Sequence, residues 1–462
     1  MGQAATRWDE LVEVLQGGDI DRLLDMYTDT AVYLEPYNPP HHGNLLIYGP
    51  GRYQFVDFVK VGTPLTILVA VVVAAVGAPA TATAPPAEPD TGGVWLAGDL
   101  HVHTTYSHDS YGGPGDENTG LNEAYTLGNT VDEHFAIAAL RGLDYLAITD
   151  HNDVRSQGHP AFGANGVIAL PGYENSLDGH AQMLGATAVA ENDTDGDGDV
   201  DASDVDRLAR RLRRAGGVFQ INHPAEGSTD FPHDIDWGYG RAVVPDAIEV
   251  WNISHAYQPP LPSGSSNDDA IRFWESWLDR GHHVAATGGS DNHYKATLAA
   301  QGPGQPTTWV FAAERTTQAV LDGLRAGRTF ISHQPPTHGG PQLFLEADGD
   351  GDGTFEAMVG DTTQRGATVR ARVIGAPGAV VRFVTDGGNE LGAFTVAGPD
   401  DTQSAVVPRA ATWVRAEVVV RDGADERAAL CDGTFGGETT YCRNRVGVLA
   451  LTSAIYLPGA PH

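Results

Sequence analysis

Between residues 94 and 333, short apolar runs alternate with segments whose apolar residues recur every three or four positions. The first pattern predicts buried strands and the second predicts amphipathic helices. Thr130 and Glu133 form a capping-box sequence that opens one helix, and Gly142 closes it. A repeated strand–helix order indicates a parallel sheet, most simply one closed into a barrel. The predicted strands are 94–96, 145–148, 167–170, 218–222, 247–252, 284–287 and 308–311, and the predicted helices are 130–142, 205–215, 270–280 and 317–325.

After Pro335 and Pro336 the pattern changes to short, partly alternating strands separated by turns. This pattern is typical of an all-β sandwich. The expected fold class is therefore an α/β barrel over residues 91–336, followed by an all-β sandwich over 337–462 with an accessory or substrate-shaping role. The predicted strands of the sandwich are 368–374, 379–384, 412–420 and 446–452.

Residues 1–60 form a separate N-terminal segment. Apolar stripes at 6–28 predict helical structure there. The run from Leu11 to Pro36 resembles the start of an α+β domain of the nuclear-transport-factor-2-like type, but the strands that would complete its sheet are missing. We expect a truncated segment of this kind and assign it no function.

Residues 61–90 contain an uncharged apolar run at 64–77, followed by small residues and a Pro-rich linker. Arg52 and Lys60 precede the run, which gives the layout of a secretory signal over residues 62–82. The run is shorter than the roughly 20 residues of a membrane-spanning helix. Either translation begins near Val61 or the segment is an internal anchor; a buried core helix fits the Ala/Pro tail less well. The sequence therefore predicts a secreted, periplasmic or cell-surface protein.

The composition narrows the range of partners. The formal net charge is -32, and the chain has only two lysines. Such a chain repels nucleic acid and anionic membrane surfaces, so we expect a small-molecule substrate, and membrane contact only through an N-terminal anchor. Cys431 and Cys442 would form a disulfide in an exported protein and remain thiols in the cytosol. The sequence does not indicate an oligomeric state.

Side chains of the metal-ligand type follow several predicted strands. His101 and His103 are two positions apart, so on an extended strand they point to the same face. In barrels of parallel strands the chemistry sits at the carboxyl ends of the strands. With no thiol nearby, such a set suits Zn, Mn or Fe, and a carboxylate such as Glu174 can bridge two ions. The residues at or just beyond strand ends are His101, His103, His151, Glu174, His223, Asp291 and His293.

These residues lie in motifs that resemble those of the polymerase-and-histidinol-phosphatase metallohydrolase superfamily. The resemblance covers residues 94–333, and segments 247–252, 308–311 and 326–332 resemble its carbaryl-hydrolase-like branch. It implies a distorted (βα)7 barrel with two or three metal ions. The motifs, in family order, are His101-x-His103, Thr149-Asp150-His151, Gly172-x-Glu174, Asn222-His223-Pro224 and Ser290-Asp291-x-His293.

The resemblance also implies roles for individual residues. Asp99 and Asp150 are expected to orient neighbouring imidazoles, and the catalytic candidates are Glu174, His223, Asp291 and His293. Five other histidines match no motif and are interpreted as structural: His134, His159, His233, His255 and His282. The first ion would be held by His101, His103, Glu174 and Asp291, the second by Glu174, His180 and His223, and the third by His151, His293 and either Asp109, which we prefer, or His108.

Three functions follow from this interpretation. Clustered divalent ions lower the pKa of a bound water and neutralise charge on substrate oxygens. We expect a metal-dependent phosphoesterase that acts on phosphomonoesters or phosphodiesters. The branch resemblance keeps open a carbamate, ester or amide hydrolase. A calcium-dependent binding protein with an inactive barrel is the alternative from another class, and the complete ligand set argues against it.

Two acidic loops resemble calcium-binding loops. The first has oxygen ligands at the spacing of a twelve-residue loop, with Gly198 at position 6, and we expect structural Ca²⁺ there. A solvated acidic turn is the alternative. The second loop begins in the same way at Asp348, but its twelfth position is Val359, which offers no carboxylate. The predicted ligands of the first loop are Asp193, Asp195, Asp197, Asp199, Asp201 and Asp204.

Overall fold

The computed structural model describes residues 92–108, 110, 128–224, 237–252, 267–293, 302–419 and 448–458. All of them belong to one compact unit, Ala82–His462. The expected segments 1–60 and 61–90 lie outside the described residues, and so do Asp109, His233, His255 and both cysteines. Among the helices that the structure describes, none is long and apolar enough to cross a membrane.

One sheet of the first half has five strands in the order β4-β5-β6-β7-β8. Strands β6, β7 and β8 are parallel, as predicted, whereas β5 runs antiparallel to both β4 and β6. The sequence analysis did not predict this hairpin, whose tight turn includes Gly179 at a φ of 91°. The strands are β4 (Glu174–Leu177), β5 (Gly179–Leu184), β6 (Val218–Ile221), β7 (Ala247–Asn252) and β8 (Ala285–Gly289).

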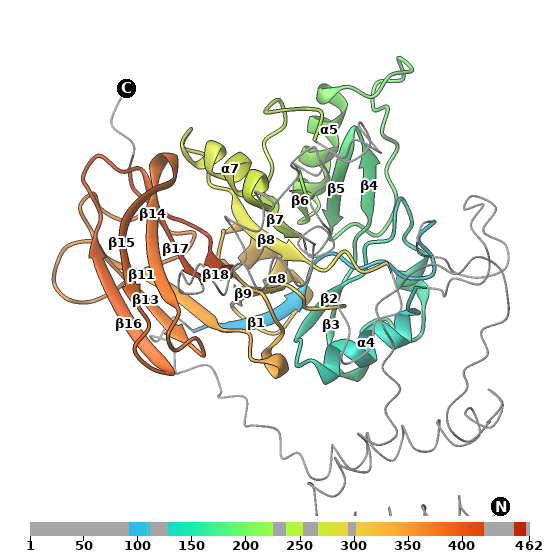
Figure 1. The fold of residues 1–462 in the computed structure, drawn as a ribbon. Helices are drawn as coiled ribbons and strands as arrows, with labels where there is room; N and C mark the ends of the chain where they lie inside the picture. Colours follow the sequence, from blue (N-terminus) through green and yellow to red (C-terminus); the bar gives the residue numbers. More distant parts are fainter. Residues whose placement is uncertain are drawn as a thin grey trace, which may run out of the picture. The chain divides into compact units, whose positions relative to one another are not determined.

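A second sheet has ten strands and runs through both halves of the unit (Figure 1). Its path is β15-β14-β17-β18-β10-β9-β1-β2-β3, and β19 pairs with β17. The strands are β1 (Val94–Asp99), β2 (Tyr145–Ala147), β3 (Ile168–Leu170), β9 (Thr307–Ala312), β10 (Thr329–Ser332), β14 (Val380–Thr385), β15 (Asn389–Thr395), β17 (Trp413–Val419), β18 (Val448–Thr452) and β19 (Ile455–Tyr456).

Strand direction in this sheet differs in part from the prediction. Strands β1, β2 and β3 are parallel, but β9 is antiparallel to β1 and to β10. The prediction of an all-parallel sheet was therefore wrong for β9. The physical reason is that an antiparallel strand buried on both faces carries the same apolar run as a parallel one.

Backbone hydrogen bonds beyond the strand ends join the two sheets. After β8, the N–H of Asp291 donates to the carbonyl of His101, which follows β1, at 2.8 Å. At the start of β4, the N–H of Glu174 donates to the carbonyl of Thr149, which follows β2, at 3.2 Å. The ring of strands β1-β2-β4-β5-β6-β7-β8 is thereby closed at this end, in a mixed α/β fold.

Within the described residues, four α-helices pack outside these strands. Helix α5 contacts β6, α7 contacts β7 and α8 contacts β9. The predicted capping box of α4 is confirmed, because the Glu133 side chain accepts a hydrogen bond from the N–H of Thr130 at 2.9 Å. The helices are α4 (Val131–Leu140), α5 (Ala202–Arg214), α7 (Asn267–Leu278) and α8 (Thr317–Arg325), with short 3₁₀ turns η1 (Arg155–Gly158), η2 (Ala164–Gly166), η3 (Pro336–His338) and η4 (Asp386–Gly388).

A third, four-stranded antiparallel sheet lies in the second half, in the order β12-β11-β13-β16. Its buried residues share one apolar core with those of β1, β10 and β14. Because β10 pairs with β18, the boundary expected at residue 336 separates strands of one continuous sheet. The strands are β11 (Gln342–Asp348), β12 (Ala357–Met358), β13 (Thr368–Ile374) and β16 (Asp400–Val406).

Candidate metal centre

Asp99, which is fully buried, connects the segment that follows β1 to the segment that follows β8. Its Oδ1 accepts hydrogen bonds from the N–H groups of His101 and Ser290, both at 3.1 Å. Its Oδ2 accepts a third from the N–H of Gly304 at 2.7 Å. The expected role of Asp99, orienting an imidazole, is not what the structure shows. The carboxylate instead satisfies backbone N–H groups at the point where the strands end.

Asp150 has a similar role after β2. Its carboxylate accepts hydrogen bonds from the N–H of Thr104 at 2.6 Å and from the Thr104 hydroxyl at 2.9 Å. It fixes the loop after His103 instead, which corrects the second expectation about an imidazole partner.

Four candidate ligand atoms meet at one buried point: two from residues after β1, one from the start of β4 and one from a residue after β8. The Nε2 atom of His101 lies 3.0 Å from Nε2 of His103 and 3.0 Å from Oε2 of Glu174. The Oδ1 atom of Asp291 lies 3.1 Å from both Nε2 atoms, and Oε2 of Glu174 lies 3.1 Å from His103 Nε2. Atoms that bind one ion at about 2.0–2.2 Å are separated by about 3.0–3.5 Å, so this group has the size of a metal site.

The electrostatics of this group fit a cation. Burial alone would lower the pKa of His101, but the carboxylates of Asp291 and Glu174 outweigh it and raise this pKa well above its usual value. Burial also opposes protonation of His103, yet hydrogen bonds to the same carboxylates raise its pKa to about 10. Despite their burial, the carboxyl groups of Glu174 and Asp291 have pKa values well below the ordinary range because the imidazoles surround them. This buried negative charge requires either protons on the imidazoles or a divalent ion.

The second oxygen of Glu174 faces a different pair of imidazoles. Its Oε1 lies 3.2 Å from Nδ1 of His180 and 3.4 Å from Nε2 of His223. The amide of Asn222 donates to the same oxygen at 2.7 Å. The β4–β5 hairpin brings His180 opposite Ser176 in the ladder, close to the carboxylate. Glu174 therefore lies between two groups of ligands, as a bridging carboxylate would.

A third group adjoins the first. His103, His151 and His293 each offer one ring nitrogen, and these atoms lie within 4.8 Å of one another. The rings of His103 and His293 stack at 3.9 Å between centroids. The ring of His108 lies 5.0 Å from that of His151, whereas Asp109 is outside the described residues. The choice between the two as a ligand stays a prediction.

Two of the predicted ligands have a left-handed backbone. The φ angle is 23° at His223, after β6, and 47° at Asp291, after β8. Such a conformation costs a residue other than glycine roughly 1–3 kcal/mol and persists where surrounding contacts hold it. The N–H of His223 is held by the carboxylate of Glu249 at 3.2 Å. Contacts of the backbone N–H groups, with Glu249 for His223 and with the carbonyl of His101 for Asp291, thus hold both residues in this conformation.

Glu249 is the site residue that the sequence analysis missed. It is fully buried in β7, and its Oε1 lies 3.1 Å from Nδ1 of His101. The signal was present, because an acidic residue inside the apolar strand 247–252 needs a polar partner. His134, interpreted as structural, contacts the carbonyl of His103 through Nε2 at 2.9 Å.

Comparisons with known proteins give a limited match. The family described as "Protein of unknown function (DUF3604)" matches residues 93–161. No curated protein matches the chain.

Several solved structures are similar in fold. A two-domain protein from Bacteroides vulgatus containing a predicted PHP-like metal-dependent phosphoesterase is 18% identical, with a TM-score of 0.38, over 71% of this chain and 92% of that one. PsfC from Pseudomonas syringae is 19% identical, with a TM-score of 0.32, over 51% and 90%. An amidohydrolase from Chromobacterium violaceum is 18% identical, with a TM-score of 0.27, over 43% and 88%. Because these TM-scores are below 0.5, the role of the centre rests on its own geometry.

The first acidic loop is only partly arranged around one point. Oxygens of Asp193, Asp195 and Asp197 lie within 4.8 Å of one another. Asp201 caps α5 by accepting hydrogen bonds from its first-turn backbone. Asp204 accepts hydrogen bonds from the N–H of Asp201 and from the backbone across the loop. Calcium binding here stays a prediction.

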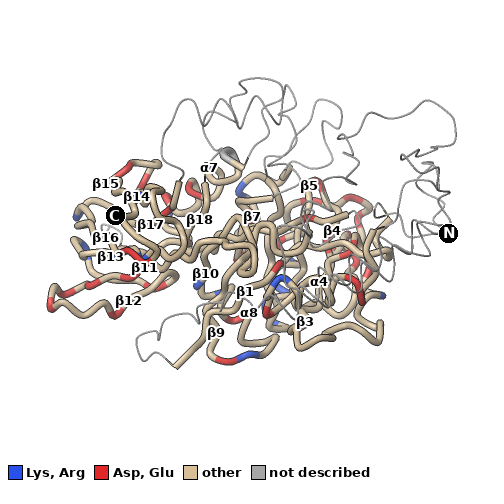
Figure 2. Tube along the Cα trace, turned by 60° about the horizontal axis from the view of Figure 1, so that its bottom comes forward, with Lys and Arg blue, Asp and Glu red and all other residues tan. Residues whose placement is uncertain are grey.

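The second acidic loop connects β11 and β12, where Figure 2 shows a run of acidic residues. Asp348 accepts hydrogen bonds from the N–H groups of Gly351 at 2.7 Å and Gly353 at 2.9 Å. Both glycines have φ angles of 80–90°, which suit glycine best. The contacts describe a tight acidic turn and do not distinguish a calcium loop from a solvated one.

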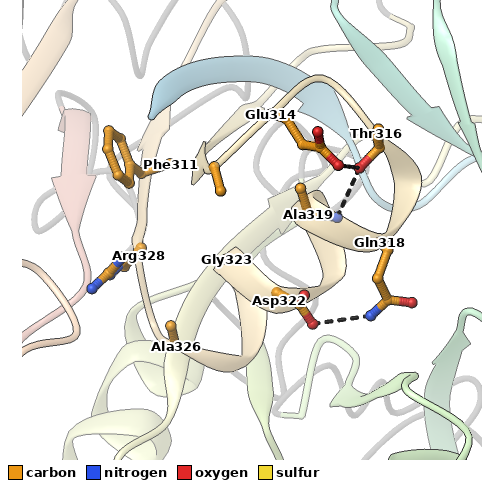
Figure 3. A pocket seen from close by; sticks show the side chains of 10 residues that line it. Phe311, Glu314, Thr316, Gln318, Ala319, Asp322, Gly323, Ala326 and Arg328 are labelled. Carbon is orange, nitrogen blue, oxygen red and sulfur yellow. Dashed lines mark hydrogen bonds between the residues drawn. The ribbon is translucent and has the colours of Figure 1, made fainter. Parts of the chain in front are cut away.

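A pocket of about 250 Å³ lies away from the ligand cluster, between β9 and α8 (Figure 3). Val94 pairs with Ala312, so this pocket adjoins the start of β1, opposite to the end that carries the histidines. The polar side chains in it already have partners, since Thr316 contacts Glu314 and Gln318 donates to Asp322. The pocket is not part of the candidate centre.

Proposed function

We propose that this chain is a metal-dependent hydrolase of phosphoesters, built on a distorted (βα)7 barrel. The observation that carries the proposal is the position of Glu174, whose Oε2 lies 3.0–3.4 Å from three imidazole nitrogens and whose Oε1 lies 3.2–3.4 Å from two others. A carboxylate shared in this way suits two neighbouring divalent ions, an arrangement common in enzymes of phosphoester hydrolysis.

The donor set suits Zn, Mn or Fe, because it combines imidazoles with carboxylates. Divalent ions bound here would lower the pKa of a water molecule and neutralise the charge that develops on a phosphoryl group. The first group of ligands would hold one ion in a buried position, and the third group would hold an additional ion. The ligands proposed are His101, His103, Glu174 and Asp291, then His180 and His223 with Glu174, and finally His151 and His293.

Substrate would reach the cluster from its more exposed side. The side chains of His180 and His293 are 18% and 19% exposed, whereas those of His101 and His103 are inaccessible. Among the partly exposed residues, His293 also contacts the Asp291 carbonyl through Nδ1 at 2.9 Å, which orients its ring. With two ions bound, His293 is the residue that we assign to protonation of the leaving group; with a third ion bound, its ring would be a ligand instead and could not supply that proton.

The test is an assay of the purified full-length chain after chelation and after reloading with Zn²⁺, Mn²⁺ or Fe²⁺. The substrates are an aryl phosphate, an aryl phosphodiester, an aryl carbamate and an anilide. We expect metal-dependent release of the aryl group from a phosphate substrate. Turnover of only the carbamate or the anilide would assign the other hydrolase class. Metal bound without turnover of any substrate would contradict an enzymatic role.

A further inference from the structure

Glu249 lies behind His101, on the side of the ring away from the other ligands. Its Oε1 is 3.1 Å from Nδ1 of His101, while Nε2 of the same ring is 3.0 Å from Glu174. The side chain of Glu249 is fully buried. A carboxylate in this position accepts the Nδ1–H of the imidazole and leaves a lone pair on Nε2.

The other oxygen of Glu249 has two further donors. Oε2 accepts hydrogen bonds from the N–H of His223 and from the Nδ2 amide of Asn252, both at 3.2 Å. With Nδ1 of His101, three donors converge on two oxygens. A glutamine has one oxygen and one NH₂ group in place of the two oxygens. Its NH₂ group would therefore face at least one of these three N–H donors and could not accept a hydrogen bond from it. The position therefore requires a carboxylate.

The chain leaves space for this contact at Gly289 in β8. A Cβ atom at Gly289 would lie 2.3 Å from Cβ of His101 and 2.6 Å from Oε1 of Glu249. Both distances are shorter than real contacts of a Cβ, so any other residue there would separate the carboxylate from the ring.

Asn252 extends the same contacts to a second carboxylate of the cluster. Its Nδ2 atom lies 3.0 Å from Oδ2 of Asp291, and its backbone N–H donates to Oδ1 of Asn267 at 3.1 Å. Glu249 thus contacts His101 directly, holds the backbone of His223, and reaches Asp291 through one amide. His101 and Asp291 belong to the first proposed ligand group, and His223 belongs to the second.

We propose that Glu249 is a positioning residue of the metal centre. It fixes the Nδ1–H tautomer of His101 and holds His223 at its left-handed backbone, so that both imidazoles face Glu174. This inference rests on the proposed metal-dependent function.

The contacts of Glu249 differ from those of a structural buried carboxylate. Glu417 in β17 is also fully buried, but it is paired with the guanidinium groups of Arg415 and Arg382. The contacts of Glu249 within the described residues are with histidines, an amide and a backbone N–H. Glu417 is therefore a matched control.

The experiment compares Glu249→Gln with Glu417→Gln in the full-length chain. Calorimetric titration with Zn²⁺ and the visible absorption spectrum of the Co²⁺ form report on the centre, and Tm of the metal-free protein reports on folding. We expect Glu249→Gln to weaken Zn²⁺ binding by about 10–100-fold and to change the Co²⁺ spectrum. Glu417→Gln should lower Tm and leave Zn²⁺ affinity and the spectrum as in the wild type.

Wild-type affinity and an unchanged spectrum in Glu249→Gln would overturn this inference alone. A wild-type protein that binds neither ion would overturn the proposed function and this inference together. If Glu249→Gln does not fold, Glu249→Asp keeps the charge but withdraws the carboxylate from Nδ1 of His101, and we expect a loss of Zn²⁺ affinity of the same kind. A folded Glu249→Asp protein with wild-type affinity and spectrum would likewise overturn the inference.

Discussion

Two groups of buried charges in this unit are neutralised in different ways. In the candidate metal centre, Glu174 and Asp291 face imidazoles, which can lose their protons. Between α7 and β17, the guanidinium of Arg415 donates to Glu275 and Glu417 at 2.6–2.9 Å. Arginine does not release its proton in proteins.

This difference between imidazole and guanidinium partners decides whether each group of charges can exchange protons for a cation. Burial works against the charge of Arg415, but the two carboxylates outweigh it and raise the pKa of the guanidinium. Arg415 in turn holds the pKa of Glu417 below its usual value despite burial. That group is permanently compensated and connects the two halves of the unit. In the cluster of histidines around Glu174 and Asp291, either protons on the imidazoles or metal ions can balance the negative charge. This cluster can therefore exchange protons for a metal cation.

The largest effect is expected from Glu174→Gln, which removes the carboxylate shared by the ligand groups. Turnover should fall to background, a loss well beyond the roughly 10–100-fold of a residue outside the ligand set. Metal content, measured by mass spectrometry of the dialysed protein, should fall as well. His159→Ala, which changes a histidine outside the cluster, is the control with wild-type turnover. Near-normal activity of Glu174→Gln would refute the bridging role.

Arg415→Met tests the permanently compensated group. Removal of one partner of a buried ion pair costs about 3–5 kcal/mol, because the remaining charge is left without a partner. We expect the free energy of unfolding in urea to fall by this amount while Zn²⁺ affinity is retained. A loss of Zn²⁺ affinity in the folded variant would show that the two groups are coupled.

The metal affinity of the cluster of histidines around Glu174 and Asp291 should depend on pH. The pKa of His101 is raised and that of His103 is raised to about 10, so the metal-free protein holds protons there at neutral pH. Metal binding must displace them, and affinity should rise by about tenfold per pH unit for each proton released. Titration in buffers of different ionisation enthalpy counts these protons. Binding without proton release would contradict the proposed exchange.

The same shifts predict the opposite trend for stability without metal. A raised histidine pKa in the folded state contributes stability that is complete below the unfolded value of about 6.5. This contribution is lost as the pH rises through the folded value, which is about 10 for His103. Urea unfolding of the chelated protein from pH 6 to 9 should therefore show declining stability. Constant stability across this range would argue against protonated imidazoles in the cluster.

The smallest effect is expected from Arg382→Gln. The side chain of Arg382 is 33% exposed, and Glu417 retains Arg415 as its partner. Solvent screening limits the contribution of such a pair, so the loss of stability should be about 1 kcal/mol or less. Urea unfolding of this variant and of Arg415→Met under the same conditions compares their losses in the free energy of unfolding. Equal losses in the two variants would show that both guanidinium groups are needed to compensate Glu417.

Much of the fold could be predicted from periodicity. The apolar runs identified β1, β2, β6 and β7 closely, and helix α8 has the predicted bounds Thr317–Arg325. The HisxHis spacing and the strand ends also located the ligand cluster, because parallel strands bring their carboxyl ends together whatever the loops between them are.

Other features depend on contacts that one-dimensional patterns do not contain. The direction of β9 and the hairpin of His180 are properties of strand pairing rather than of apolar spacing. The roles of Asp99 and Glu249 depend on which donors surround a buried carboxylate, and those donors come from residues up to 205 positions away along the chain. An acidic residue in an apolar strand indicates that a polar partner exists, but the sequence does not show which residue that partner is.

The pairing of β10 with β18 has a practical consequence for protein production. In a shortened chain that stops after β10, the edge of β10 that normally pairs with β18 would have unpaired N–H and C=O groups. Such an edge is a template for pairing with other chains. Such a product should aggregate, and limited proteolysis should not release a soluble fragment that carries the candidate metal centre. Expression designs for this protein therefore need to retain the strands up to Tyr456.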